Sequence, residues 1–282
     1  MNGEHPVGLV ALDIDGTIVG PNGVFEDVKD AVRNLQRHGW LVVVATGRSP
    51  VHALGPASVI AGRKGLGVCS NGAVTAWFET KPALVGESPM RVPGEPEAVV
   101  RSWEIEDLIE FNPREVLEIM LGAFPDALCG LEIRGEKYLL NAPFPDGHLP
   151  TPYHVAEYEQ LLDASVTRVA VYSPNHTSQE FSEVATAHGL NCVGYDLGSS
   201  GWIDIALPGV SKATGLEALR RRYGIAPENT VAIGDGPNDL DMLDWAGTAV
   251  APGNAGNDVK ERADLVVGRF DEGGVAEFLR GL

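Results

Sequence analysis

The sequence predicts an α/β protein whose core is a doubly wound parallel sheet, with an α+β domain inserted into the core. Three observations carry this prediction. Short apolar runs alternate with helical patterns near the N-terminus, the same alternation returns near the C-terminus, and the middle of the chain follows a different pattern. Buried apolar strands separated by single helices are typical of a parallel sheet that is covered on both faces.

The N-terminal part of the chain begins this alternation. Apolar runs at Val7–Leu12, Leu41–Ala45 and Leu66–Cys69 have the length of buried strands. Between the first two, apolar residues recur at helical spacing over Phe25–Leu35, and a second helix is expected from about Pro50. We therefore expect the polar residues at the C-terminal ends of these strands to face one crevice.

The C-terminal part repeats the alternation with shorter elements. Strands are predicted at Ile203–Leu207, Thr230–Ile233, Thr248–Val250 and Leu265–Val267. Helices are predicted from Ser211 to Tyr223, over Asp239–Ala246 and over Gly274–Leu279. These segments complete the predicted core, which comprises residues 1–76 and 205–282.

The middle of the chain, residues 77–204, predicts a separate domain. It contains two longer helical patterns, Pro96–Phe111 and Arg114–Phe124, and a hairpin-like stretch over Leu131–Leu140. An apolar strand at Val166–Tyr172 is followed by a helix over Ser178–His188. An α+β segment inside an α/β chain is typical of an inserted domain, here expected to lie over the crevice.

Composition and charge exclude several classes of protein. The chain has 282 residues, 44% of them hydrophobic, so it is not a disordered protein. Lys and Arg number 21 against 39 Asp and Glu, which gives a net charge of −18. Such a field repels phosphate backbones and anionic lipids, so we expect neither nucleic acid nor a membrane as a partner. A small phosphorylated substrate remains possible where a cation reverses the charge locally.

The sequence also indicates a cytoplasmic protein. No apolar run approaches the roughly 18 to 20 residues that span a bilayer, and the first residues lack the pattern of a signal peptide. The three cysteines are odd in number and widely spaced, which is typical of reduced thiols.

Several common catalytic motifs are missing from the sequence. The pair Gly65 and Gly67 would need a glycine at Ser70 to make a dinucleotide fingerprint, and Gly234 and Gly236 would need one at Asp239. There is no Gly-Lys-Ser/Thr for a P-loop, no pair of histidines at helical spacing for zinc, and no nucleophile elbow. Clusters of residues with oxygen-bearing side chains remain as the candidates for a functional site.

Two acidic clusters follow predicted strands. Asp13-Ile14-Asp15-Gly16-Thr17 comes directly after the first strand, and Gly234-Asp235-Gly236-Pro237-Asn238-Asp239 comes after another. Parallel topology would bring both to the same edge of the sheet. Carboxylates at a buried strand end are costly unless they are paired, and Mg²⁺ with its waters and a substrate phosphate removes that cost.

Two further polar residues complete a candidate site for phosphoryl transfer. Thr46 follows the second strand and Lys212 begins a helix, so a hydroxyl and an ammonium can hold a phosphoryl group. Each feature alone has a simpler explanation, since Asp before Gly is common in turns and a single lysine is usually solvated. However, turn chemistry alone does not readily explain why all four features, the two acidic clusters, Thr46 and Lys212, lie at the ends of elements in one sheet.

These four segments together resemble the ordered motifs of haloacid dehalogenase-like phosphatases. Their sequences are Asp13-Ile-Asp-Gly-Thr, Thr46-Gly-Arg, Lys212 and Gly234-Asp-Gly-Pro-Asn-Asp. The large insert between the second and third motifs, residues 77–204, is similar to the α/β cap of the Cof-type branch, which implies that this inserted domain selects the substrate. The resemblance covers nearly the whole chain and implies a Rossmann-like core.

The resemblance implies a role for each motif residue. Asp13 would attack phosphorus and become an aspartyl-phosphate, and Asp15 would be the general acid and base. Thr46 and Lys212 would hold the phosphoryl oxygens. Asp235 would bind Mg²⁺ together with a carboxylate oxygen of Asp13 and the backbone carbonyl of Asp15.

The remaining site residues also come from the resemblance. Asp239 would be a further metal ligand or would accept hydrogen bonds behind the metal. Asn238 would contact the phosphate or order Lys212, Asn71 and Gly72 would line the crevice, and Gly47 and Arg48 would face substrate.

The predicted function is a Mg²⁺-dependent phosphomonoester hydrolase for a small phosphorylated metabolite, such as a sugar phosphate or a phosphoglycerate-type ester. Ion-pumping relatives carry Thr at the position of Asp15, so the aspartate here favours hydrolysis. A phosphomutase is the first alternative, although the insert offers fewer arginines than a bisphosphate would need. A phospho-aspartate signalling protein is the second, but such receivers are roughly 100 to 150 residues long. A non-catalytic Mg²⁺-binding protein is the third.

Overall fold

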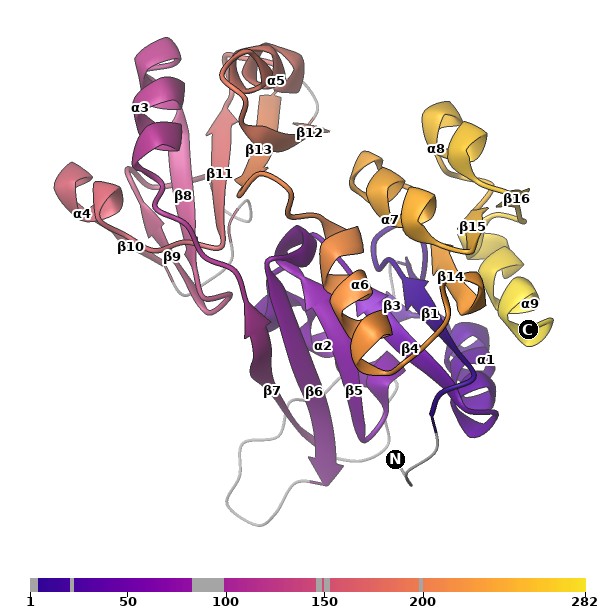
Figure 1. Cartoon of the computed structure of the whole chain (residues 1–282). Helices are drawn as coiled ribbons and strands as arrows, with labels where there is room; N and C mark the ends of the chain where they lie inside the picture. Colours follow the sequence, from indigo (N-terminus) through magenta and orange to yellow (C-terminus); the bar gives the residue numbers. More distant parts are fainter. Residues whose placement is uncertain (1–4, 21–22, 83–98, 146–148, 150–152, 198–199) are drawn as a thin grey trace. The chain divides into compact units, whose positions relative to one another are not determined.

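The computed structural model describes residues 5–20, 23–82, 99–145, 149, 153–197 and 200–282. It divides into two compact units, which Figure 1 colours along the sequence. Unit 1 comprises Met1–Glu106 and Ser211–Leu282, and unit 2 is the contiguous segment Asp107–Val210. The division falls at later positions than the predicted boundaries after residues 76 and 204.

Unit 1 is built on an eight-stranded sheet with the order β16-β15-β14-β1-β4-β5-β6-β7. From β16 to β5 neighbouring strands are parallel, and β6 runs antiparallel to β5. The strands are β1 (Gly8–Leu12), β4 (Trp40–Ala45), β5 (Lys64–Cys69), β6 (Val74–Pro82), β7 (Val99–Leu108), β14 (Thr230–Ile233), β15 (Thr248–Ala251) and β16 (Leu265–Val266). A short ribbon, β2 (Val19–Gly20) with β3 (Gly23–Val24), follows β1.

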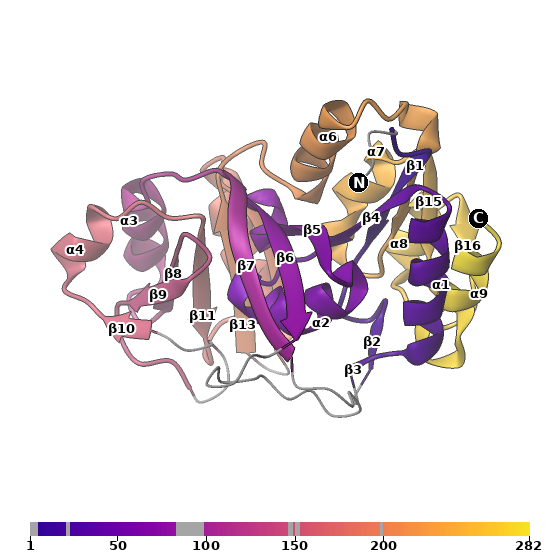
Figure 2. The same cartoon turned by 90° about the horizontal axis from the view of Figure 1, so that it is seen from below.

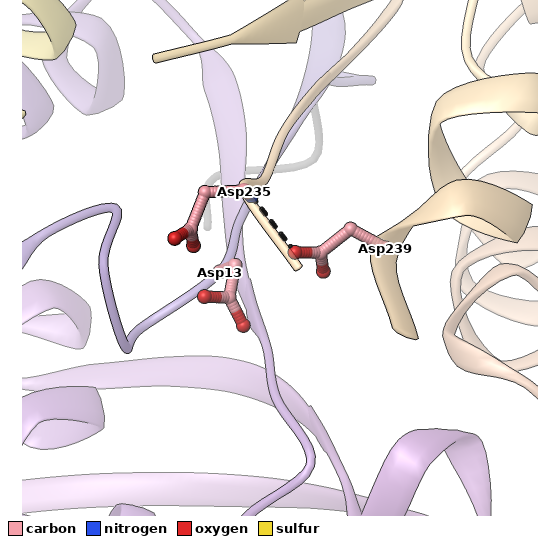
Figure 3. Close-up of side chains that lie close together, drawn as sticks. All are labelled: Asp13, Asp235 and Asp239. Atoms are coloured by element: carbon pink, nitrogen blue, oxygen red, sulfur yellow. Dashed lines mark hydrogen bonds between the residues drawn. The ribbon is translucent and has the colours of Figure 1, made fainter. Parts of the chain in front are cut away.

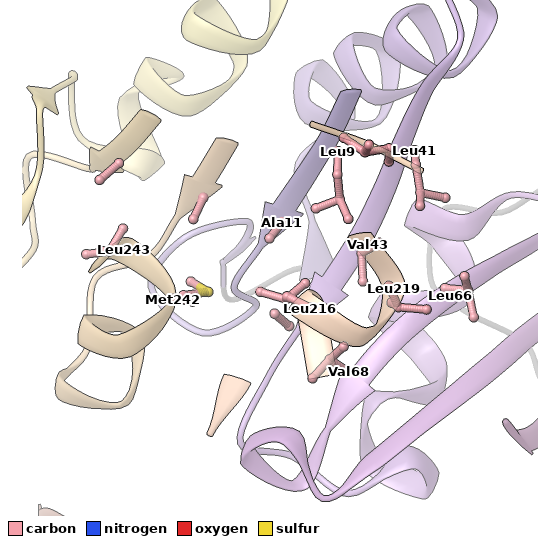
Figure 4. Close-up of a cluster of buried hydrophobic side chains, with 14 of the residues drawn as sticks. Leu9, Ala11, Leu41, Val43, Leu66, Val68, Leu216, Leu219, Met242 and Leu243 are labelled. Atoms are coloured by element: carbon pink, nitrogen blue, oxygen red, sulfur yellow. The ribbon is translucent and has the colours of Figure 1, made fainter. Parts of the chain in front are cut away.

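Helices cover both faces of this sheet, as expected for buried parallel strands (Figure 2). On one face, apolar residues of α6, α7 and α8 pack against the strands in a continuous core (Figure 4). The other face carries α1, α2 and α9. The helices are α1 (Glu26–Arg37), α2 (Pro50–Ala61), α6 (Lys212–Arg222), α7 (Leu240–Trp245), α8 (Asn257–Arg262) and α9 (Gly274–Arg280).

The sequence explains why these segments form these elements. All five residues of β1 are buried, which is typical of a strand covered on both faces. Helix α1 buries Val28, Ala31, Val32 and Leu35, which recur every third or fourth residue and so form one stripe.

Unit 2 contains a six-stranded sheet with the order β10-β9-β8-β11-β13-β12. Its strands are β8 (Leu128–Ile133), β9 (Lys137–Leu140), β10 (Tyr153–Val155), β11 (Arg168–Ser173), β12 (Asn191–Leu197) and β13 (Ser200–Ala206). Its helices are α3 (Arg114–Ala123), α4 (Tyr158–Leu162) and α5 (Ser178–Ala187). Residues from all three helices share one apolar core with the sheet. The predicted α/β class, with a mainly parallel core sheet and a separate inserted sheet, is confirmed.

One element prediction was wrong, and one predicted strand belongs to a different sheet from the one expected. The segment Pro96–Phe111 was expected to be helical, but its described part forms β7 at the edge of the unit 1 sheet. Exposure alternates along Arg101–Glu106, and this two-residue period is that of a strand. The strand expected at Ile203–Leu207 exists as β13, but it pairs with β11 and β12 in unit 2.

Two further observations concern the whole described chain. Cys69, Cys129 and Cys192 are free thiols. None of the helices in the described ranges combines the length and the hydrophobicity needed to cross a bilayer.

Candidate active site

The two predicted acidic clusters meet at one edge of the unit 1 sheet. Asp13 follows β1 and Asp235 follows β14, and these neighbouring parallel strands end in register at Leu12 and Ile233. The backbone N–H of Asp13 donates to the carbonyl of Ile233 at 3.0 Å, which extends the ladder into the site. The carboxylates of Asp13 and Asp235 form a group with that of Asp239, in which one oxygen of each lies within 4.8 Å of the others (Figure 3).

Lys212 lies between two of these carboxylates. Its ammonium donates to Oδ1 of Asp13 and to Oδ1 of Asp239, both at 2.6 Å, and its side chain is fully buried. The helix that carries it begins here because Ser211 and Thr214 cap each other, with the Ser211 N–H donating to Thr214 Oγ1 at 2.7 Å. Lys212, which was predicted to begin a helix, is therefore the first residue of α6 and places its ammonium among the acidic side chains.

Gly72 allows this helix start to approach the end of β5. It has a φ of 102°, and a Cβ there would lie 1.9 Å from the carbonyl oxygen of Ser211. Only glycine fits such a contact with this backbone conformation. Within unit 1, Gly72 therefore allows close packing beside Lys212. This packing is enough to explain a glycine here, whether or not Gly72 also contacts the substrate.

Asp239 holds the loop that carries Asp235. Its Oδ2 accepts from the backbone N–H groups of Asp235 and Gly236, each at 2.9 Å, while Oδ1 accepts from Lys212. The short 3₁₀ turn Pro237–Asp239 directs the side chain back toward the loop. Because Asp239 already accepts three hydrogen bonds, one of them from the Lys212 ammonium, the geometry favours the second predicted role for Asp239, that of a hydrogen-bond acceptor behind the metal position.

Among the described residues, the three carboxylates of this cluster carry more negative charge than Lys212 balances. Burial, followed by repulsion from Asp239, raises the pKa of Asp13 to about 8, although Lys212 opposes this. Burial and then Asp239 also raise the pKa of Asp235 to about 6. Burial alone would lower the pKa of Lys212, but attraction to Asp13 and Asp239 outweighs it and raises the pKa. Oxygen donors with excess negative charge fit a hard divalent cation such as Mg²⁺.

A residue that the sequence analysis did not identify helps to fix Asp235. Asn254 donates from Nδ2 to the carbonyl of Gly16 at 2.8 Å and to Oδ2 of Asp235 at 3.3 Å. Thr17 Oγ1 donates to the other oxygen, Oδ1, at 3.1 Å. Asn254 follows β15, so it is also a polar residue just beyond a parallel strand, which is the signal that could have identified it.

A second group of predicted residues lies at the ends of β4 and β5. Asn238 donates from Nδ2 to Oδ1 of Asn71 at 3.0 Å, and this links the second acidic loop to the turn after β5. A Cβ on Gly47 would lie 3.1 Å from Oδ1 of Asn71, so the chain beside Thr46 packs closely on this amide pair. Thr46 is buried, and its Oγ1 accepts from the backbone N–H of Arg48 at 3.1 Å.

Asp15 has different surroundings from Asp13. Its carboxylate accepts two hydrogen bonds from Arg48, from Nε at 2.8 Å and from Nη2 at 2.5 Å. The Asp15 side chain is 59% exposed, whereas Asp13 is buried. The two carboxylates of the first motif therefore occupy separate environments, one paired with a buried lysine and one with a half-buried arginine.

Comparison with known proteins identifies the family. The profile of the haloacid dehalogenase-like hydrolases matches residues 10–90 and 144–279, which include every motif residue described above. The chain belongs to this family. The recognition made from the motifs and the enzyme class, a phosphatase of the haloacid dehalogenase-like superfamily, are therefore confirmed.

Two relatives that match over nearly the full length of both chains are named as phosphatases. The chain is 28% identical to the pyridoxal phosphate phosphatase YbhA of Escherichia coli, over 96% of this chain and 97% of that protein. It is 30% identical to a phosphoglycolate phosphatase of Methanopyrus kandleri, over 97% and 96% of the two chains. A solved phosphatase of this superfamily from Bacteroides thetaiotaomicron has a TM-score of 0.74 at 23% identity, covers 100% of this chain and is itself covered over 97% of its length. That structure shows the same fold.

Proposed function

We propose that this haloacid dehalogenase-like hydrolase is a Mg²⁺-dependent phosphomonoesterase in which Asp13 is the nucleophile. The observation that supports it best is the buried contact of Asp13 with Lys212 at the end of β1, next to Asp235. A carboxylate held by a cation and placed among metal-binding oxygens can attack an anionic phosphoryl group once the surrounding charge is neutralised.

The proposed reaction has two chemical steps. In the first, an oxygen of Asp13 bonds to phosphorus, the bond from phosphorus to the ester oxygen breaks, and Asp15 gives its proton to the departing oxygen. In the second, water attacks phosphorus, Asp15 takes a proton from that water, and the bond to Asp13 breaks to release inorganic phosphate. Loss of one general acid or base of this kind typically costs about 10²- to 10⁴-fold in rate.

The other residues of the site bind and orient the phosphoryl group. Lys212 fixes the Asp13 carboxylate through Oδ1 and supplies positive charge beside it. Thr46 and Asn238 have polar side chains at the same sheet edge and are proposed to contact the phosphoryl oxygens. Asp13, Asp235 and the carbonyl of Asp15 are proposed to hold Mg²⁺, which when bound offsets the negative charge of substrate and carboxylates.

The proposed substrate is a small phosphorylated metabolite. From the sequence we expect a sugar phosphate or a phosphoglycerate-type ester. The names of two full-length relatives add pyridoxal phosphate and phosphoglycolate as candidates. All four are monoesters of small hydroxyl compounds, so a single panel of such esters covers the proposal.

The proposal is tested by phosphate release from this panel, with Mg²⁺ and with excess chelator. We expect Mg²⁺-dependent release from one or a few members and its loss in Asp13→Asn, which cannot form the acyl phosphate. Asp30→Asn, a change at an exposed carboxylate on α1, is the matched control and should keep full activity. Full turnover by a folded Asp13→Asn protein would remove Asp13 from the nucleophile role. Isomerised phosphate esters without released phosphate would instead indicate a phosphomutase.

A further inference from the structure

We infer that Arg48 is a positioning residue that aims the carboxyl group of Asp15 at the leaving oxygen; this rests on the proposed function. The resemblance implied only that Arg48 faces substrate. In the structure its guanidinium binds Asp15 through two parallel hydrogen bonds, from Nε at 2.8 Å and from Nη2 at 2.5 Å. Two bonds between planar groups fix direction as well as distance, which a single contact does not do.

The backbone of Arg48 is itself held by its neighbours in the site. Its N–H donates to Thr46 Oγ1 at 3.1 Å, and its carbonyl accepts from the N–H of Ser70 at 2.8 Å. Its Nη1 also donates to the carbonyl of His52 at 3.4 Å. The arginine is therefore anchored at both ends, and it connects the ends of β4 and β5 to the Asp15 carboxylate.

Asp15 needs such an anchor because, in the part of the chain that the structure describes, Arg48 is the residue that donates hydrogen bonds to its side chain. The side chain is 59% exposed, so packing restricts its rotamers less than those of a buried residue such as Asp13. A general acid must lie within hydrogen-bond reach of the atom that it protonates. Without Arg48, the carboxyl group of Asp15 would sample several rotamers, and only some of them would reach the leaving oxygen.

This role predicts that the effect of Arg48 depends on the leaving group. An alkoxide must take a proton as it departs, whereas p-nitrophenolate is stable without one. The parameter kcat/KM reports the steps up to the phosphorylation of Asp13, which include departure of the leaving group. Removing the arginine should therefore reduce kcat/KM strongly for an alkyl phosphate and weakly for p-nitrophenyl phosphate.

The experiment compares Arg48→Ala, Arg48→Lys and wild type on p-nitrophenyl phosphate and on the alkyl phosphate that the panel identifies. We expect Arg48→Ala to lower kcat/KM about 100-fold for the alkyl ester and less than about 5-fold for the aryl ester. Arg48→Lys, which keeps the charge but not the paired geometry, should recover part of the loss. Arg33→Ala removes another arginine from an exposed ion pair, with Asp30 on α1, and should match wild type on both esters.

Equal losses on the two esters would overturn the inference. They would mean that Arg48 binds the phosphoryl group common to both substrates, or supports the fold. Such a result leaves the proposed function intact as long as wild type still hydrolyses the panel ester. If wild type releases no phosphate from any ester, the proposed function fails, and the inference about Arg48, which rests on it, fails with it.

Discussion

The raised pKa of Asp13 predicts how the stability of the metal-free protein changes with pH. In the folded protein, burial and the neighbouring Asp239 raise this pKa from the ordinary 3.8 to about 8. Between these two values the folded state keeps a proton on Asp13 that the unfolded chain has released. The folded state therefore loses stability as pH rises, and the contribution of Asp13 is fully present only below pH 4.

The size of the effect follows from the same two values. One pKa unit corresponds to about 1.4 kcal/mol, so each pH unit between 4 and 8 should lower the free energy of unfolding by about that amount. From pH 5 to pH 7 the expected loss due to Asp13 is about 3 kcal/mol. This is an upper value, because Asp235, whose pKa is raised to about 6, repels Asp13 and titrates with it.

The assay is urea unfolding followed by tryptophan fluorescence at pH 5, 6 and 7 in the presence of chelator. Wild type should lose stability over this range, and Asp13→Asn, which has no proton to release at this position, should lose much less. Mg²⁺ binds the ionised carboxylates, so it should stabilise wild type more at pH 7 than at pH 5. Equal pH slopes for wild type and Asp13→Asn would refute the reasoning.

Three substitutions test other contacts in the site. Lys212→Met should destabilise the protein by about 3–5 kcal/mol at pH 7, because it leaves buried carboxylates without their cation, and urea unfolding that matches wild type would contradict this. Gly72→Ala places a Cβ 1.9 Å from the carbonyl oxygen of Ser211 at a φ of 102°, so its thermal midpoint should fall. Gly122→Ala, at an exposed position of α3 where a Cβ meets no other atom, should leave the midpoint unchanged or raise it slightly. Asn254→Ala should raise the Mg²⁺ concentration for half-maximal activity, and an unchanged Mg²⁺ titration would show that Asn254 does not position Asp235.

The strand ends of unit 1 were predictable because each follows from a local pattern. A buried apolar run sets a strand, and parallel topology brings the residues after each strand to one edge, so Asp13 and Asp235 could be placed together without a structure. The edge strand β7 was not predicted, because its charged residues alternate with partly buried ones and resemble a solvated helix until their period is counted.

The contacts inside the site could not be predicted from the sequence, for a different reason. Spacing places Asp239 near Asp235, but it does not say that the two oxygens of Asp239 already accept from Lys212 and two backbone N–H groups. The pairing of Arg48 with Asp15 likewise depends on rotamers set by tertiary packing. Residue types and positions were thus predictable, whereas the assignment of each donor to each acceptor required three-dimensional coordinates.

The order of strands in the unit 1 sheet also affects how the chain can fold during synthesis. Strand β1 pairs with β4, which follows it closely, and with β14, which emerges only after all of unit 2. The ion pair between Asp13 and Lys212 joins residues 199 positions apart. Unit 2 is contiguous, so it can complete its own sheet before β14 is synthesised. During that time one edge of β1 has no strand to pair with. We therefore expect the nascent chain to expose this apolar strand edge for most of translation, a period in which chaperone binding to β1 would protect the protein from aggregation.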